Sequence, residues 1–264
     1  MHSECLLSPP AGQIPARFNR AIYGGSMTES IILSKLELLD LPADPDKAHQ
    51  LLTYLQMLLE WNKSMDLTAV TDEEEVLDRH FLDSLILLKH PEYLKGPVLD
   101  LGTGAGFPGL PLAIFRPDLS FTLADAQNKR LKFLEAVIAA LELENVTLVH
   151  SRAEDMGRSP AFRETFGTCA ARAVASLPVL CEYLLPMVSI GGCSVCWKGP
   201  SVLDEMTNGR RAAHLLGGHL LEPISYAIPG RDWQHMLLPI EKVSSTPKAY
   251  PRKAGTPGKS PLGS

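Results

Sequence analysis

The chain has 264 residues, of which 45% are apolar and 21% charged, and these proportions are those of an ordinary globular protein rather than of a disordered or collagen-like chain. Its net charge of −5 argues against a protein that coats nucleic acid over its whole surface. No apolar run approaches the roughly 20 residues of a membrane helix, and the first residues lack a signal-peptide pattern, so we expect a cytoplasmic protein without membrane contact.

Two segments precede the main domain that a chain of this length is expected to contain. Residues 1–27 are rich in Pro, Gly and Ser, which predicts a disordered arm. From 28 to 94, apolar residues recur at helical spacing, which predicts a small N-terminal helical subdomain. Two of its helices are expected to end before Pro42 and near Trp61, and a third is expected to begin after Asp72.

Beyond Pro97, short apolar runs alternate with helical ones, which is typical of βαβ units. We therefore expect an α/β fold, Rossmann-like, with a doubly wound and mostly parallel sheet over 95–243 and a basic tail over 244–264. The predicted strands are 98–101, 120–124, 146–150, 167–171, 193–197, 218–227 and 233–241. The predicted helices are 110–115, 129–143 with Asn128 as its cap, 177–188 and 202–216.

A glycine-rich segment, LDLGTGAGFPG, follows the first predicted strand directly. Gly102, Gly104, Gly106 and Gly109 allow the backbone to turn tightly and to approach a ligand without clashes from Cβ atoms. The segment therefore predicts a nucleotide-cofactor site. Its spacing also matches the dinucleotide fingerprint, which is a weak signal when it stands alone.

Three residues in this segment or just after it favour one cofactor over another. Pro108 and Pro111 each remove a backbone N–H of the kind that holds a pyrophosphate, which counts against NAD or FAD. Asp100 places a carboxylate beside the loop, where it would repel a phosphate but suit a ligand with a sulfonium and an ammonium group. The loop therefore favours S-adenosylmethionine.

Charged residues follow the later strands at the same predicted edge of the sheet. Asp125 ends the second strand, where its oxygens can accept hydrogen bonds from ribose hydroxyls. Arg152, Ala153 and Glu154 follow the third strand and would lie over an adenine, and Arg172 ends the fourth strand. Because open α/β sheets bind ligands at the carboxyl ends of their strands, these residues are candidates for the cofactor site.

Seven segments of the chain, in order, resemble those of the bacterial 16S ribosomal RNA guanine-N7 methyltransferases, the RsmG or GidB family. The resemblance covers residues 54–199, and the tail YPRKAGTPGKSPL (250–262) is also similar to the C-terminal ending of many members. The segments are LLEWNKSMDLTAVTD (58–72), RHFLDSL (79–85), VLDLGTGAGFPGLPLAI (98–114), TLADAQNKRLKFL (122–134), VHSRAED (149–155), ARAVASL (171–177) and WKG (197–199).

This resemblance implies a class I methyltransferase that uses S-adenosylmethionine, without a metal, to methylate N7 of a guanine in the 530 loop of 16S rRNA. The implied partner is that RNA, within the small ribosomal subunit. The family's cofactor contacts fall on Gly102, Phe107, Asp125, Ala153, Glu154 and Arg172. The resemblance thus adds Phe107 to the residues that the strand-end pattern indicates, and it singles out Ala153 as a contact.

The chain departs from the family pattern at three places. Asp66 stands where the family usually has Asn, and Ala171 stands where it usually has Ser. The last strand, usually a charged Arg-His followed by apolar residues, reads RDWQHMLLPIEK (231–242). None of these departures touches the cofactor motifs, so they concern the substrate and the strand ends.

The chemistry implied by the resemblance needs positioning more than proton transfer. Guanine N7 carries a lone pair and no proton, so no general base is required and we name none. The groups expected to face RNA are Arg79, His80 and Asp83 on the third N-terminal helix and Lys198 after the fifth strand.

The end of the chain is basic. From Lys242 onward there are five basic residues and no acidic one, and Arg252 and Lys253 are candidates to hold RNA phosphates. We expect that deleting 247–264 weakens RNA binding and its salt dependence but leaves cofactor affinity nearly unchanged.

Other functions fit parts of the sequence. An NAD-dependent oxidoreductase fits the glycine spacing, and a small-molecule or protein methyltransferase, or a non-catalytic RNA-binding module, fits other features. Cys193 and Cys196 have the spacing of half a zinc site, but no second Cys or His pair stands nearby. We therefore expect these thiols to be buried in a strand as apolar groups.

Overall fold

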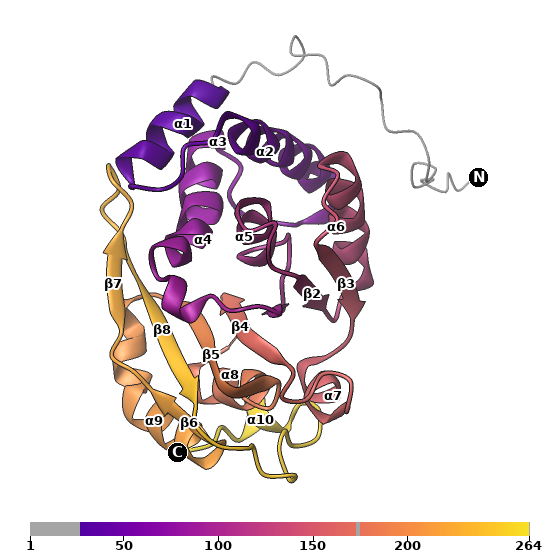
Figure 1. Cartoon of the computed structure of the whole chain (residues 1–264), viewed down its shortest axis with the longest axis vertical. Helices are drawn as coiled ribbons and strands as arrows, with labels where there is room; N and C mark the ends of the chain where they lie inside the picture. Colours follow the sequence, from indigo (N-terminus) through magenta and orange to yellow (C-terminus); the bar gives the residue numbers. More distant parts are fainter. Residues whose placement is uncertain (1–26, 173–174, 264) are drawn as a thin grey trace, which may run out of the picture.

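The computed structural model describes residues 27–172 and 175–263 (Figure 1). Apart from Met27, the predicted arm at 1–27 lies outside the described residues. Among the helical elements, η1 is a π-helical turn and the other η elements are 3₁₀-helices. The helical elements are α1 (Glu29–Leu38), α2 (Pro45–Met65), α3 (Glu73–Val76), η1 (Leu77–Leu82), α4 (Asp83–Leu85), η2 (Ile86–Lys89), η3 (Pro91–Tyr93), α5 (Gly109–Phe115), α6 (Asn128–Ala140), α7 (Ala153–Arg158), α8 (Leu177–Leu184), η4 (Pro200–Glu205), α9 (Met206–Leu215) and α10 (Thr256–Lys259).

The strands form one mixed sheet in the order β3-β2-β1-β4-β5-β8-β6, and β7 also pairs with β8. The strands are β1 (Val98–Leu101), β2 (Phe121–Asp125), β3 (Val146–His150), β4 (Phe166–Arg172), β5 (Val188–Lys198), β6 (Gly218–Leu220), β7 (Ile224–Ala227) and β8 (Gln234–Lys242). β1 to β5 are parallel, and β8 is antiparallel to its three neighbours. The predicted doubly wound, mostly parallel sheet is confirmed.

The strand order fixes where a ligand can bind. The chain moves outward from β1 to β3 and then returns to place β4 on the other side of β1. In open α/β sheets, ligands bind at the carboxyl ends of the strands beside such a reversal. The glycine-rich loop follows β1 and therefore stands at this point.

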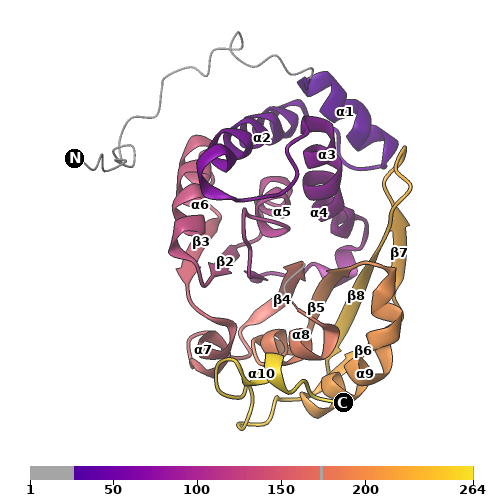
Figure 2. The ribbon, with the colours of Figure 1, turned by 180° about the vertical axis from the view of Figure 1, so that it is seen from behind.

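Helices cover both faces of the sheet (Figures 1 and 2). Successive side chains of a strand point to opposite faces, so Val98 joins the core formed with α1 to α6, whereas Leu99 joins the core formed with α7 to α9. Leu55 of α2 and Phe133 of α6 belong to the first core. The helices before β1 thus share their core with the sheet, while the predicted domain boundaries remain predictions. Across 27–172 and 175–263, no helix is long and apolar enough to span a membrane.

The first two predicted N-terminal helices are present. The side chain of Thr28 caps α1 by accepting from the Ile31 N–H, and Asp44 caps α2 just before Pro45. The third predicted helix is broken into α3, η1, α4 and η2. Arg172 donates from Nη1 to the carbonyl oxygens of Arg79 and His80 at 2.9 and 3.4 Å. We attribute the π-helical turn to this side chain, because it competes for carbonyl groups of the helical ladder.

Two local predictions are wrong. The single strand expected over 218–227 is divided into β6 and β7, because Pro223 between them has no N–H to donate to the ladder. Asn128 does not cap α6 but is its first residue, and the preceding Gln127 makes no side-chain cap. Instead Asp125 Oδ1 accepts from the Gln127 N–H at 2.8 Å. The carboxylate at the end of β2 thus provides a hydrogen-bond partner for a backbone N–H just before α6.

The C-terminal segment folds back onto the body. It carries the short helix α10 and lies beside α7 and α8 (Figure 2). Pro251 is buried, and its ring lies so close to Gly157 that a Cβ at that glycine would be 2.9 Å from it. The predicted tail is therefore packed rather than extended away from the protein.

Candidate functional site

The loop between β1 and α5 owes its shape to glycines with positive φ. Gly104 and Gly106 have φ angles of 61° and 103°, which side chains other than that of glycine rarely tolerate. Tyr54 of α2 donates from its hydroxyl to the carbonyl oxygen of Ala105. A Cβ at Gly106 would collide with that hydroxyl and lie 2.9 Å from Leu134. The loop is therefore pressed closely against the helices that cover it.

Asp100 lies at the base of this loop and is fully buried. Its Oδ2 accepts from the hydroxyl of Thr103 at 2.6 Å and from the Gly109 N–H at 2.8 Å. Its Oδ1 is also buried but has no hydrogen-bond partner among the described residues. Burial raises the pKa of Asp100 to about 6, against the hydrogen bonds from Thr103 and Gly109, which lower it. A buried carboxylate oxygen without a partner indicates a place for a donor from a ligand.

Asp125, at the end of β2, lies beside the loop as the sequence predicts. Its Oδ2 accepts from the Gly104 N–H at 3.0 Å and from Arg130 at 3.3 Å. The carboxylate is 3% exposed, so in this structure it holds the loop against the end of the neighbouring strand. Its contact with a ribose remains a prediction.

Phe107 and Arg172 form a wall between the loop and the N-terminal helices. The ring of Phe107 stacks on Tyr54 and on His80, with centroids 5.4 and 5.0 Å apart. The guanidinium of Arg172 lies 5.0 Å from the centre of the Phe107 ring and pairs with Asp83 Oδ2 at 3.0 Å. The structure thus gives both residues a packing role, and their predicted contact with the cofactor remains a prediction.

His80, predicted to face RNA, lies against Thr68 and Arg172, and its contact with RNA remains a prediction. Its Nε2 lies 2.8 Å from the hydroxyl of Thr68, and its Nδ1 lies 3.3 Å from Nη2 of Arg172. Burial and the charge of Arg172 lower the pKa of His80 to about 4. The ring is therefore neutral near pH 7 and is engaged at both nitrogens, which gives it a structural role.

Asp83, which was expected to face RNA, is instead the centre of a buried cluster. Its Oδ1 accepts from the hydroxyl of Tyr226 and from Nδ1 of His235, both at 2.6 Å, while Oδ2 binds Arg172. Burial acts to raise the pKa of Asp83, but the bond from His235, the charge of Arg172 and the bond from Tyr226 hold it below its usual value. Sequence reasoning missed Tyr226 and His235, and the only signal was the departure of the last strand from the family pattern.

Glu154, the predicted adenine contact, is buried and holds the C-terminal segment. Its Oε1 accepts from the Gly255 N–H at 2.9 Å. Ala153, also predicted at the adenine, begins α7 and is only partly buried. The candidate adenine site and the end of the chain are therefore in direct contact, which the sequence did not indicate.

Arg252, predicted to hold an RNA phosphate, forms an ion pair within the protein. It forms a bidentate pair with the fully buried Glu182, with Nη2 to Oε2 at 2.6 Å and Nε to Oε1 at 2.9 Å. Because a buried carboxylate needs a partner, Arg252 has a structural role in this ion pair, and its contact with RNA remains a prediction. Lys253, next to it, is exposed and keeps its predicted role.

The other two RNA-facing candidates lie at the carboxyl edge of the sheet or near it. Arg79 lies 5.2 Å from the centre of the Trp233 ring, and its guanidinium is 3.8 Å from Glu75. Lys198 ends β5 and binds Glu205 at 3.2 Å. Their contacts with RNA remain predictions.

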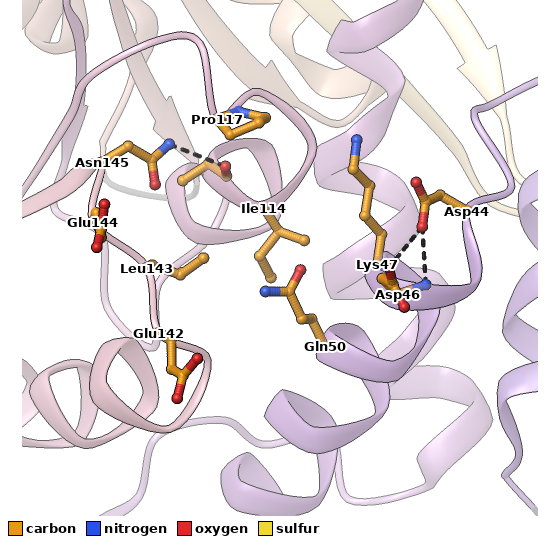
Figure 3. Close-up of a pocket in the computed structure, with 11 residues that line it drawn as sticks. Asp44, Asp46, Lys47, Gln50, Ile114, Pro117, Glu142, Leu143, Glu144 and Asn145 are labelled. Atoms are coloured by element: carbon orange, nitrogen blue, oxygen red, sulfur yellow. Dashed lines mark hydrogen bonds between the residues drawn. The ribbon is translucent and has the colours of Figure 1, made fainter.

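Two pockets lie at the other end of the parallel strands from the glycine-rich loop. One, of about 430 Å³, is bounded by the start of α2 and by the turns before β2 and β3, with Lys47, Gln50 and Asn145 among its lining residues (Figure 3). The other, of about 560 Å³, adjoins Tyr93 and Lys242. Both stand at the amino ends of the parallel strands, so neither belongs to the site at the glycine loop.

We expect Gly106→Ala to lower the free energy of unfolding by about 2 kcal/mol, because the new Cβ adds steric overlap to an unfavourable φ. Chemical denaturation measures this change. Gly104→Ala is the matched control, because the atom nearest to its new Cβ would be 4.0 Å away. It should lower the free energy of unfolding by only about 1 kcal/mol, the cost of a positive φ for alanine. Equal losses in the two variants would contradict the packing argument.

Comparisons with known proteins identify the family of the chain. The family model described as rRNA small subunit methyltransferase G (GidB) matches residues 47–227. A protein of Alkaliphilus metalliredigens named ribosomal RNA small subunit methyltransferase G is 50% identical over 221 residues, which cover 83% of this chain and 92% of that protein. One of the same name from Lactobacillus johnsonii is 43% identical over 239 residues, which cover 89% of this chain and 100% of the other.

Among solved structures, M. jannaschii TYW2 in complex with AdoMet is similar with a TM-score of 0.47 and 13% identity, over 61% of this chain and 77% of that one. The family assignment depends on the sequence matches instead. The family model spans more than half of the chain, and the relatives match it over nearly their full length. The chain therefore belongs to the rRNA small subunit methyltransferase G family.

Proposed function

We propose that the protein transfers a methyl group from S-adenosylmethionine to N7 of a guanine in the 530 loop of 16S rRNA. The observation that carries the choice of cofactor is the buried Oδ1 of Asp100, which lacks a partner among the described residues. An ammonium group would satisfy this oxygen, whereas a phosphate would be repelled by it. Membership in a family named for small-subunit rRNA methylation supports the RNA substrate.

The residues that would hold the cofactor come from three strand ends. Asp100 is suited to the ammonium group, and Asp125 to the ribose hydroxyls, with the backbone of Gly102 and Gly104 between them. Ala153 and Glu154 would contact the adenine, and Glu154 still has Oε2, for which the described residues give no hydrogen bond. When bound, the cofactor supplies an electrophilic methyl group on a sulfonium.

The protein contributes orientation rather than acid-base catalysis. The lone pair of guanine N7 attacks directly, so aligning the two reactants is the main task, and such alignment is worth up to roughly 7 to 11 kcal/mol in well-oriented systems. Positive charge moves onto the purine during transfer, so carboxylates and other acceptors at the strand ends stabilise the transition state. The buried pair of Arg172 with Asp83 keeps the nearby guanidinium neutralised.

The test uses the purified full-length protein with labelled S-adenosylmethionine and unmethylated 30S particles, 70S ribosomes or naked 16S rRNA. We expect alkali-labile N7-methylguanine in the 530 loop with at least one of these substrates, and 30S particles are the substrate we propose. Label at another site, or none with any of the three, would overturn the proposal. Thermal shift with S-adenosylhomocysteine and with NADH separates the oxidoreductase alternative, because only a ligand of the folded state raises the melting temperature.

A further inference from the structure

His235 is an imidazole at the carboxyl edge of the sheet that the mechanism above does not use. It is the second residue of β8, and its neighbour Met236 is paired with Lys198, the last residue of β5. Since β8 is antiparallel to β5, the start of β8 lies at the carboxyl ends of the parallel strands. His235 therefore stands at the edge where the cofactor loop lies.

A short chain of contacts connects His235 to that loop. Phe107 of the loop lies under Arg172, Arg172 pairs with Asp83, and the other oxygen of Asp83 binds Nδ1 of His235. Only two side chains separate the loop from the imidazole. A base that reaches the methyl group from the side of β4 and β5 would thus come close to His235.

The imidazole is held in one orientation. Its Nδ1 lies 2.6 Å from Asp83 Oδ1, and its ring centre lies 4.6 Å from that of Trp233, which itself lies under Arg79. Tyr226, opposite His235 on β7, donates to the same carboxylate oxygen. Asp83 is the acceptor for both groups, so Nδ1 of His235 carries the hydrogen.

This arrangement leaves the second ring nitrogen available. The side chain of His235 is 28% exposed, whereas that of Asp83 is 1% exposed. The contact with Asp83 uses Nδ1, and Nε2 has no hydrogen bond among the described residues. With a hydrogen on Nδ1 and none on Nε2, Nε2 is an acceptor.

We propose that Nε2 of His235 accepts the N1–H of the target guanine, with Asp83 as the positioning residue that fixes the tautomer. This inference rests on the proposed function of the site. Guanine has a hydrogen at N1, whereas adenine has a lone pair there that would face the lone pair of Nε2. A site that leaves a polar group unpaired with the wrong base rejects that base strongly.

The same hydrogen bond also aids the reaction. Methylation at N7 places positive charge on the purine, which makes its N1–H a better donor. The bond to His235 therefore strengthens between the ground state and the transition state, which is the condition for an effect on kcat. No proton is transferred and no further reagent is needed.

The experiment compares three bases at the target position of 16S rRNA in 30S particles: guanine, hypoxanthine (introduced as inosine) and 2-aminopurine. All three keep N7, but 2-aminopurine lacks the N1–H. We expect the wild-type protein to methylate guanine and hypoxanthine at least a hundredfold faster, in kcat/KM, than 2-aminopurine. In His235→Leu we expect guanine methylation to fall at least thirtyfold, mainly in kcat, and the preference over 2-aminopurine to shrink to within threefold.

Two further variants separate substrate contact from structure. His235→Gln keeps an acceptor and should recover part of the preference, while Tyr226→Phe removes the other donor to Asp83 but should leave the preference intact. Affinity for S-adenosylhomocysteine should be unchanged in all three variants. A preference that persists in His235→Leu, or equal wild-type rates on guanine and 2-aminopurine, would overturn the inference. Absence of any guanine methylation by the wild-type protein would instead reject the proposed function.

Discussion

Removing residues 247–264 is expected to lower both the stability of the protein and its affinity for the cofactor. The segment supplies the Gly255 N–H to Glu154, and its Pro251 packs against Gly157 and accepts from Arg158 at 2.9 Å. All three partners belong to α7, which begins the predicted adenine site. The expectation from sequence alone, that cofactor affinity is nearly unchanged by this deletion, is therefore replaced by the opposite one.

The loss of stability comes mainly from one charge. In the intact protein the carboxylate of Glu182 is fully buried and paired with Arg252, so the deletion removes its cation. Removing one partner of a buried pair costs about 3 to 5 kcal/mol, which corresponds to a fall in melting temperature of roughly 10 °C for a chain of this size. Release of α7 should weaken S-adenosylhomocysteine binding by about tenfold, the equivalent of one lost hydrogen bond. Differential scanning calorimetry and isothermal titration calorimetry measure the two effects.

Three variants show which part of the segment acts. Arg252→Met should reproduce most of the loss of stability, and adding Glu182→Gln should restore much of it, because no charge is then buried. The double variant Lys253→Ala with Lys259→Ala removes exposed cations only and should weaken RNA binding, with a smaller salt dependence, while cofactor affinity stays as in the wild type. Unchanged cofactor affinity in the deletion would refute the link between the segment and α7.

The sheet and the residues at its strand ends are predicted well, because local sequence pattern and topology determine them. The alternation of short apolar runs with helices predicts the sheet, and the carboxyl-end rule brings Asp100, Asp125 and the glycine loop to one place. These residues lie close to their strands in sequence. Each is positioned by the strand that precedes it, so single-sequence reasoning is sufficient.

Long-range side-chain partners are not predictable in the same way. The sequence gives no sign that Arg252 is paired, because its partner Glu182 lies 70 residues away. Nothing in the local sequence around Glu182 indicates that its carboxylate is buried. In the sequence, His235 is only part of a departure from the family pattern. Its role depends on Asp83, which lies 152 residues earlier. The break in the third helix depends likewise on Arg172, which comes from another strand.

Replacing Asp100 by Asn is expected to weaken cofactor binding about a hundredfold while making the ligand-free protein more stable. The carboxylate is fully buried, and only one of its oxygens has partners among the described residues. A hydrogen bond to a charged group is worth about 1.5 to 3 kcal/mol, so loss of the contact with an ammonium group accounts for the change in affinity. The amide keeps the shape of the carboxyl group and still accepts from Thr103 and Gly109.

The sign of the stability effect follows from the pKa. Burial raises the pKa of Asp100 in the folded protein to about 6, above the value of about 3.9 in an unfolded chain. The unfolded state therefore releases its proton first, and the folded state loses stability as pH rises from about 4 to 6, with the full cost present above pH 6. This difference corresponds to about 3 kcal/mol, which Asp100→Asn should regain at pH 7 and not at pH 4.

Binding provides the complementary measurement. In the wild-type protein, the carboxyl group must lose its proton to bind a cation, so affinity for S-adenosylhomocysteine should fall tenfold for each pH unit below about 6. In Asp100→Asn, this dependence should be absent, and Thr103→Val, which removes only a donor to the other oxygen, should keep it. If the Asn variant binds the cofactor as tightly as the wild type, the unpaired oxygen does not face the ligand. The choice of S-adenosylmethionine over a dinucleotide would then lose its main structural support, because Pro108 and Pro111 argue only against a phosphate and not for a cation.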